Sequence, residues 1–320
     1  AYTAPHWPLH AKPEDIAKYH RAYDGGWDKL RQDRYDRQVE LGLFDPANTP
    51  LEPNTSGRRW NDLGPDEKAY ESAIMSVHAA MVDCVDQGIG RILDALQAAG
   101  ALDNTLILFF ADNGASPERG YRPGFDRNGH TRDGTAVDYD ASTGLGSETT
   151  YPYLGQAWAS AVNSPFRYWK KESYEGGCHS PMIIHWPDGL KTEAGACSDQ
   201  VAHVIDIMPT CLDVAGAEYP ETFNGHDIVA MDGKSLLPIL NGDQRQAHKT
   251  LFFEHEGGRA LRMGDWKLSA LRDQPWELFN LANDRTESTN LAQDYPEQLE
   301  TLNDAWVEWA RRLRAPIPDH

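Results

Sequence analysis

Hydrophobic residues between positions 66 and 99 recur at steps of three and four, which predicts one long amphipathic helix. Gly100 follows as the expected C-terminal cap of that helix. The next apolar stretch, 106–111, is short and continuously hydrophobic. It predicts a strand buried on both faces, as in the parallel sheets of α/β proteins. A second such run, 181–186, predicts another strand that ends before Pro187.

Two further segments before residue 220 have helical patterns. Polar residues dominate 14–37, but Tyr19, Tyr23 and Trp27 recur every four positions, which predicts a surface helix docking an aromatic stripe. Residues 204–215 predict a second helix. Between these segments, 116–165 shows no clear period and is rich in Gly, Thr, Asp, Tyr and Pro. It is expected to form a long loop, and such loops are often functional.

The pattern changes after about residue 245, where short strand-like pieces alternate with turns. The expected strands are 251–254, 258–262, 266–268 and 276–279, with a hairpin turn at Met263-Gly264-Asp265. A final amphipathic helix is expected over 299–313. The predicted organisation is therefore an α/β domain over 1–245, followed by a small antiparallel-sheet subdomain with a terminal helix over 246–320.

Composition narrows the possible functions of the chain. Its 320 residues are 40% hydrophobic, enough for a large buried core. Asp and Glu number 49 against 30 Lys and Arg, which gives a formal net charge of −19. This excess argues against nucleic acid and against anionic membranes as partners, because both require a basic surface. The four cysteines form no Cys-x-x-Cys pair, so a structural zinc site is not expected.

Asp112-Asn113-Gly114 directly follows the first predicted strand. Ligands of open parallel sheets bind beyond the carboxyl ends of the strands. A carboxylate and an amide oxygen at that edge would suit Ca²⁺ or Mg²⁺. The competing interpretation is a simple turn, because Asn-Gly is a favoured turn dipeptide.

His6 and Lys170 are the other candidate site residues. His6 lies between Pro5 and Pro8, which stiffen the backbone that presents it. Lys170 lies in an aromatic and basic segment before Glu175-Gly176-Gly177, where it could act as a point charge toward an anion. A solvated basic cluster is the alternative. Weaker candidates are His130, His179 and His185, the last expected as a core residue.

Taken in order, several motifs resemble the sulfatase family, and more narrowly the bacterial arylsulfatases of the alkaline phosphatase superfamily. The resemblance covers nearly the whole chain. It rests on the segments 3–9, 81–83, 86–91, 110–115, 163–167, 175–177, 232–238, 264–268 and 276–281. It implies an α/β fold with a central mixed, mostly parallel sheet flanked by helices, plus a small C-terminal antiparallel sheet with a helix.

The resemblance also implies a function and a site. Asp112 and Asn113 match the pair that binds Ca²⁺, or Mg²⁺ in some members. His6 and Lys170 match residues that contact the substrate sulfate, and they are the expected catalytic residues. The implied reaction is hydrolysis of a sulfate monoester, with a small molecule or a glycan as the substrate.

One family motif is missing from the chain. Sulfatases carry a Cys-x-Pro-x-Arg stretch whose cysteine is oxidised to formylglycine, the nucleophile. None of Cys84, Cys178, Cys197 and Cys211 fits that pattern. The chain therefore resembles the C-terminal portion of a sulfatase, and alone it is expected to be inactive. An incomplete sheet would also expose an apolar edge. The missing N-terminal segment or a second copy would then be its partner.

Two other functions remain open. A phosphonate monoester or phosphodiester hydrolase of the same superfamily would use the same metal and nucleophile chemistry. A non-catalytic sulfatase-like module could instead bind sulfated glycans or a protein. The joint presence of Asp112, Asn113, His6 and Lys170 argues against this second alternative.

Overall fold

The computed structural model describes the chain except residues 121, 125–127, 314, 316 and 318–320. The structure divides into two compact units. Unit 1 comprises 1–95, 110–182 and 252–320, and unit 2 comprises 96–109 and 183–251. The predicted division between residues 245 and 246 stays a prediction. None of the helices in the described ranges combines the length and the apolar composition of a membrane span.

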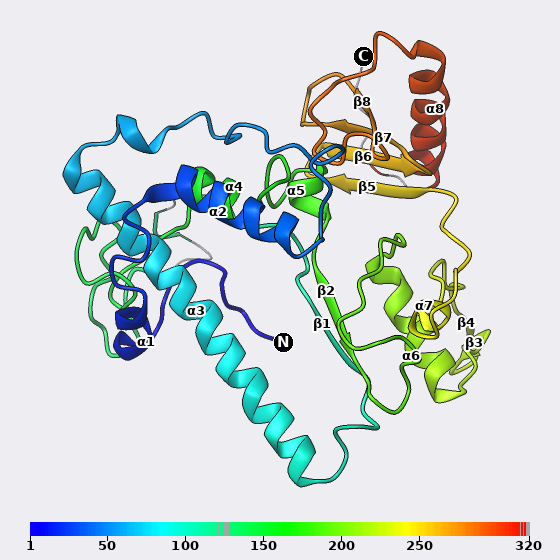
Figure 1. The fold of residues 1–320 in the computed structure, drawn as a ribbon, viewed down its shortest axis with the longest axis horizontal. Coiled ribbons are helices and arrows are strands. Elements are labelled where there is room, and N and C mark those ends of the chain that lie inside the picture. Colours follow the sequence, from blue (N-terminus) through cyan, green and yellow to red (C-terminus); the bar gives the residue numbers. More distant parts are fainter. Residues whose placement is uncertain (121, 125–127, 314, 316, 318–320) are drawn as a thin grey trace. The chain divides into compact units, whose positions relative to one another are not determined.

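Helix α3, Pro65–Ala98, is the longest element and confirms the predicted amphipathic helix (Figure 1). Its apolar stripe supplies Ile74, Val77 and Met81 to a core cluster of unit 1. The same cluster holds four tryptophans from elsewhere in the chain, namely Trp27, Trp60, Trp158 and Trp169. The helix forms because its apolar positions meet this core on one face.

The prediction of a single helix over 14–37 is wrong. The structure has α1, Pro13–Lys18, and α2, Gly26–Glu40, with turns between them. The break lies at Gly26, whose φ of +79° is a left-handed conformation that favours glycine. A Cβ there would lie 2.1 Å from the Trp60 ring. The turn allows Trp27 to pack edge-on against Trp60 at 4.8 Å, so this contact with a distant residue overrides the local period.

His78 of α3 predicts acid sensitivity. Burial lowers the pKa of His78 to about 4, and the charge of Arg34 adds to this effect. The histidine of the unfolded chain titrates near pH 6.5, so the unfolded state binds the proton more readily than the folded state. The free energy of unfolding should therefore fall as the pH is lowered from about 6.5 to about 4. In His78→Leu, thermal melts should show a smaller loss across this range. Equal losses in both proteins would contradict the prediction.

Strands β1, Ile107–Phe110, and β2, Met182–His185, confirm the two apolar strands, and they pair in a two-stranded sheet (Figure 1). The predicted burial on both faces is wrong. Phe109 is 45% exposed and Ile183 is 63% exposed, and His185, expected in the core, is exposed too. The reason is that the described sheet has two strands, so their apolar side chains lack cover.

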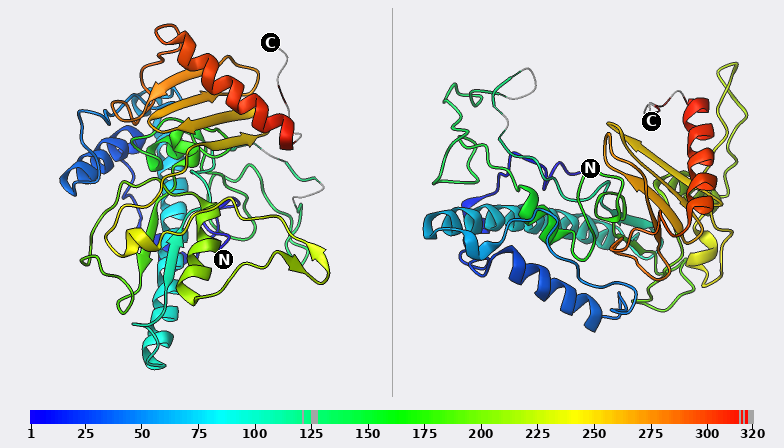
Figure 2. Two further views of the ribbon diagram at one scale, coloured as in Figure 1. Left: turned by 90° about the vertical axis from the view of Figure 1, so that its right-hand side faces the viewer. Right: turned by 90° about the horizontal axis from the view of Figure 1, so that it is seen from above.

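The predicted C-terminal sheet and helix are confirmed. Strands β5 (Leu251–His255), β6 (Gly258–Met263), β7 (Trp266–Ala270) and β8 (Glu277–Asn280) form one sheet in that order. Helix α8, Pro296–Leu313, packs on one face of the sheet (Figure 2). The pairs β6–β7 and β7–β8 are antiparallel, and Met263 pairs with Trp266 across the predicted hairpin turn. Leu261, Leu268, Leu302 and Trp306 contribute to the core between sheet and helix.

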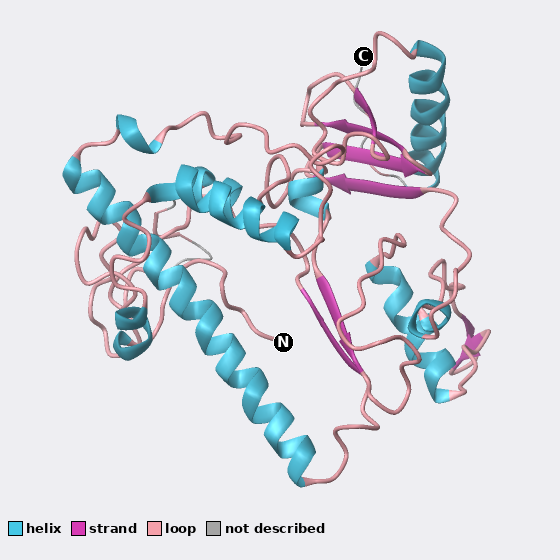
Figure 3. Ribbon diagram, viewed as in Figure 1, coloured by secondary structure: helices cyan, strands magenta, loops and turns pink. Residues whose placement is uncertain are grey.

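Unit 2 contains short elements joined by loops (Figure 3). They are η2 (Val204–Asp206), α6 (Ile207–Ala215), β3 (Thr222–Phe223), β4 (His226–Asp227) and α7 (Leu237–Leu240). The predicted helix 204–215 is thus a 3₁₀ turn that continues as α6.

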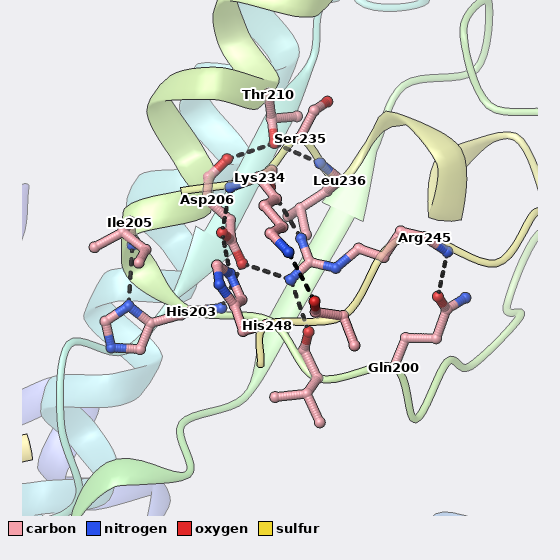
Figure 4. Close-up of polar contacts among 12 residues, drawn as sticks. Gln200, His203, Ile205, Asp206, Thr210, Lys234, Ser235, Leu236, Arg245 and His248 are labelled. Atoms are coloured by element: carbon pink, nitrogen blue, oxygen red, sulfur yellow. Dashed lines mark hydrogen bonds and ion pairs between the residues drawn. The ribbon is translucent and has the colours of Figure 1, made fainter. Parts of the chain in front are cut away.

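A buried carboxylate, Asp206, joins these elements (Figure 4). It accepts hydrogen bonds from the side chains of Arg245 at 2.8 Å and His248 at 2.7 Å, and from the backbone of His203 and Lys234. Burial opposes ionisation, but these hydrogen bonds hold the pKa of Asp206 below its ordinary value. These described hydrogen bonds therefore attach the loops that carry Lys234, Arg245 and His248 to the start of α6.

Candidate functional site

The turn that carries Asp112 and Asn113 follows β1 and lies against the loop that carries Lys170. Gly114 donates its backbone N–H to the Gly177 carbonyl at 3.0 Å. The next residue, Ala115, accepts a backbone hydrogen bond from Lys170 at 3.0 Å. The structure thus brings the expected metal ligands and the expected sulfate-contacting lysine onto adjoining backbone segments.

Asn163 links these segments, and the sequence reasoning did not identify it as a site residue. Its Oδ1 accepts a hydrogen bond from the Ala115 backbone N–H at 3.0 Å. Its Nδ2 donates to the carbonyls of Tyr168 at 3.0 Å and Gly176 at 2.9 Å. Asn163 therefore positions the site. It lies just after α4, Gln156–Val162, within the stretch 116–165 expected as loop.

Close packing of glycines fixes the same contact. A Cβ on Gly114 would lie 1.9 Å from the Gly176 carbonyl oxygen, so the two loops touch without room for a side chain. Gly176 in turn packs on the Arg167 and Tyr168 carbonyls, at 2.1 and 2.3 Å from its own notional Cβ. The Asp-Asn-Gly and Glu-Gly-Gly motifs therefore need glycine because each lies against backbone.

Gly114→Ala should lower the free energy of unfolding by about 1–3 kcal/mol, because the added methyl group would clash with Gly176. Gly90→Ala is the matched control. A Cβ at Gly90, within α3, meets nothing within 4 Å, so this change should stabilise the protein by about 0.4–1 kcal/mol. Urea denaturation measures both. A Gly114 variant as stable as the Gly90 variant would refute the packing argument.

His6 and Lys170, which are 164 positions apart, meet directly. Lys170 Nζ lies 2.9 Å from His6 Nε2. His6 Nδ1 lies 2.8 Å from the Trp7 carbonyl oxygen, which can only accept, so Nδ1 carries the proton. Nε2 is then free to accept a hydrogen bond from the Lys170 ammonium. The structure therefore orients the imidazole ring by its neighbour's backbone and directs its other nitrogen to the lysine.

The adjacent Lys171 has other partners. Its Nζ lies 3.6 Å from a Glu118 carboxylate oxygen and 3.4 Å from a Glu256 carboxylate oxygen. In the part of the chain that the structure describes, the one side-chain hydrogen bond of Lys170 is that to His6. Of the two lysines, Lys170 is therefore the one with N–H donors left for an incoming anion.

The side chains of Asp112 and Asn113 are exposed and half-buried, respectively. Within the described ranges, neither makes a hydrogen bond or an ion pair, so their oxygens are available to a ligand. The described residues include no group of three or more His, Cys, Asp or Glu side chains arranged to hold a metal.

The other histidines lie elsewhere. The ring of His179 packs edge-on against Phe166 at 4.6 Å, and His179 Nδ1 is 3.8 Å from a Glu175 carboxylate oxygen. His130 is exposed and pairs with Ala136 in an isolated β-bridge. The described contacts of these histidines do not include His6 or Lys170.

A buried ion cluster connects the Glu-Gly-Gly loop to strand β7. Lys267 Nζ of β7 lies 2.6 Å from Glu175 Oε1 and 2.9 Å from Glu287 Oε1. Glu287 also accepts the Glu175 backbone N–H at 2.7 Å. Burial raises the pKa of Glu287. Burial also opposes ionisation of Glu175, but the charges of Lys267 and His179 and the hydrogen bond from Lys267 together lower the pKa of Glu175. Sequence reasoning missed this cluster, because its members are up to 112 positions apart.

Fold and site together define an α/β protein in which a lysine–histidine pair and the Asp112-Asn113 turn lie on adjoining backbone segments. The sulfatase family model matches residues 1–217, and the model described as N-sulphoglucosamine sulphohydrolase, C-terminal, matches residues 166–308. The chain therefore belongs to the sulfatase family.

Two curated relatives of this chain are also named as sulfatases. An uncharacterized sulfatase of Schizosaccharomyces pombe is 34% identical over 281 residues, covering 83% of this chain and 48% of that protein. An arylsulfatase of Klebsiella aerogenes is 31% identical over 256 residues, which cover 78% of this chain and 53% of that protein. The chain thus spans about half the length of these relatives.

Solved structures show the same fold. The crystal structure of Ps i-CgsB is 24% identical and aligns over 97% of this chain and 49% of its own, with a TM-score of 0.57. A phosphonate monoester hydrolase from Silicibacter pomeroyi is 20% identical, and the alignment covers 97% of this chain and 55% of the hydrolase chain, with a TM-score of 0.50. These likenesses confirm the predicted alkaline-phosphatase-like α/β class.

Proposed function

We propose that the natural protein carrying this chain hydrolyses sulfate monoesters as an arylsulfatase-type enzyme. The observation that supports this best is the 2.9 Å contact between Lys170 Nζ and His6 Nε2 beside the Asp112-Asn113 turn. A sulfate ester is a weak electrophile surrounded by negative charge. Fixed cationic and hydrogen-bonding groups that face it would stabilise the charge that grows on the leaving oxygen.

A divalent cation, Ca²⁺ or Mg²⁺, fits the residues of the turn. Asp112 and Asn113 offer the hard oxygen donors that these ions prefer, and neither oxygen is occupied by another described group. When bound, the cation would supply positive charge that polarises the ester. Its remaining ligands and the formylglycine nucleophile would come from outside these 320 residues.

The chain's own residues would bind and orient the ester. Lys170 directs one N–H at His6 and has others for the sulfate oxygens. His6 is held by the Trp7 carbonyl, so its Nε2 stays at the site, where it can exchange a proton with Lys170 or with the leaving group. The Asn163 and glycine contacts keep this pair beside the Asp112-Asn113 turn.

The natural protein, purified with its formylglycine, should release 4-nitrophenol from 4-nitrophenyl sulfate. Chelation with EDTA should abolish turnover, and added Ca²⁺ or Mg²⁺ should restore it. Faster hydrolysis of a 4-nitrophenyl phosphonate monoester than of the sulfate would instead assign the protein to the phosphonate hydrolases. Absence of turnover on every sulfate ester would favour the non-catalytic module.

A further inference from the structure

Unit 1 contains a cavity that is lined by tyrosines and does not include the lysine–histidine pair. It has a volume of about 280 Å³, near the lower end of small-molecule pockets. Among the described residues, the aromatic rings that line this cavity, here called the tyrosine pocket, belong to Tyr70, Tyr139, Tyr151 and Tyr153. This size suits a single six-membered ring with its substituents.

The tyrosine rings are held in place by contacts with one another and with backbone. Tyr139 and Tyr151 stack in parallel, with centroids 4.4 Å apart and planes 11° apart. Tyr153 is buried and lies 5.5 Å from the Tyr151 ring. The Tyr139 hydroxyl donates to the Asn128 carbonyl, which anchors that ring. One face of Tyr139 and one of Tyr151 cover each other, and an unstacked face of a ring held in this way suits the C–H face of a sugar or another flat ring, because it loses little entropy on binding.

The charges at the pocket favour a neutral, hydroxyl-rich ligand. Arg119 donates to both Glu71 oxygens, at 2.8 and 2.6 Å, and Arg122 pairs with Asp140 at 2.7 Å. Asp138 also lines the pocket, so each arginine is matched by a carboxylate and one more carboxylate remains. A second sulfate would meet no net positive charge, and a bare aromatic ring would leave these polar groups unused. Sugar hydroxyls can both donate to Asp138 and Asp140 and accept from Arg122.

Two residues of the pocket wall contact the segment that carries His6. Trp7 follows His6, and its ring lies 6.2 Å from Tyr151 and 5.5 Å from Tyr153. The Leu9 backbone N–H also donates to the Pro152 carbonyl at 3.0 Å, so the two segments run together. We propose that the tyrosine pocket binds an uncharged sugar unit that neighbours the sulfated unit of a glycan substrate. This inference rests on the proposed function and adds its substrate class.

An array of unsulfated neutral oligosaccharides from plant, algal and animal polysaccharides tests the pocket directly in the natural protein. Wild type should bind at least one neutral glycan family. Tyr139→Ala should weaken that binding about tenfold or more, which corresponds to about 1.4 kcal/mol. The control Tyr219→Ala, a partly exposed tyrosine of unit 2, should bind as wild type does.

A second variant covers the case in which Tyr139→Ala fails to fold. The Asp140 side chain is 79% exposed, so Asp140→Ala should keep the fold and weaken binding, whereas the exposed Asp199→Ala should not. Failure of wild type to bind any neutral glycan would overturn the inference, as would pocket variants that bind as well as their controls. Sugar binding without hydrolysis of any sulfate ester would overturn the proposed function and leave the pocket standing.

Discussion

Replacing Lys170 with alanine in the natural protein should lower kcat/KM for 4-nitrophenyl sulfate by about 10²–10³-fold. The ammonium is directed at His6 Nε2 from 2.9 Å, and its remaining N–H groups would face sulfate oxygens. Its loss removes a fixed positive charge where negative charge accumulates in the transition state. Steady-state kinetics at saturating Ca²⁺ would measure the effect apart from any loss of metal.

The neighbouring lysine is the matched control. Lys171 has the same charge but pairs with Glu118 and Glu256, so Lys171→Ala should retain activity within about threefold. If His6 and Lys170 act as one unit, the His6→Ala/Lys170→Ala double variant should lose far less than the product of the single losses. Equal losses in the Lys170 and Lys171 variants would show that bulk charge matters and the pair does not.

Lys267→Met should lower the free energy of unfolding by about 3–5 kcal/mol, because it leaves two buried carboxylates without their cation. Lys267 is 1% exposed, and both Glu175 and Glu287 depend on it for charge balance. Urea denaturation at neutral pH measures the loss. Lys29→Met, which breaks only the exposed pair with Asp33, should cost at most about 1 kcal/mol.

The stability lost in Lys267→Met should grow as the pH rises. Without Lys267, burial raises the pKa of both carboxyl groups in the folded state above that in the unfolded state. Stability of the variant is then retained at low pH and falls as pH rises through those raised pKa values. Adding Glu287→Gln to Lys267→Met should recover part of the stability at neutral pH. A Lys267 variant no less stable than the Lys29 variant would contradict this account.

Periodic elements could be predicted from the sequence, whereas breaks and contacts between distant residues could not. The period of α3 and the strand–turn pattern of the C-terminal sheet are local, and both predictions are confirmed. The break before α2 depends on the Trp60 ring meeting Gly26, which no local pattern contains. The exposure of Phe109 likewise depends on which strands pair with β1, and the apolar sequence around Phe109 does not reveal that pairing.

The candidate site shows the same division. His6, Lys170, Asp112 and Asn113 were selected through local context and family resemblance, and their catalytic and metal-binding roles stay predictions. Asn163 lies in a segment that carries the family resemblance, but that segment does not reveal that its amide joins three backbone segments. Lys267 lies in a strand where alternation predicts only a packed surface position. Its role becomes visible only when Glu175 and Glu287 are brought to it.

A crystal structure of the natural protein, grown with Ca²⁺ and soaked with sulfate, is the most direct test of the central claim. The account predicts a cation bound to the Asp112 and Asn113 oxygens, and a sulfate within hydrogen-bond distance of Lys170 Nζ and His6 Nε2. A cation held without Asp112 and Asn113, or a sulfate seated away from the lysine–histidine pair, would contradict it.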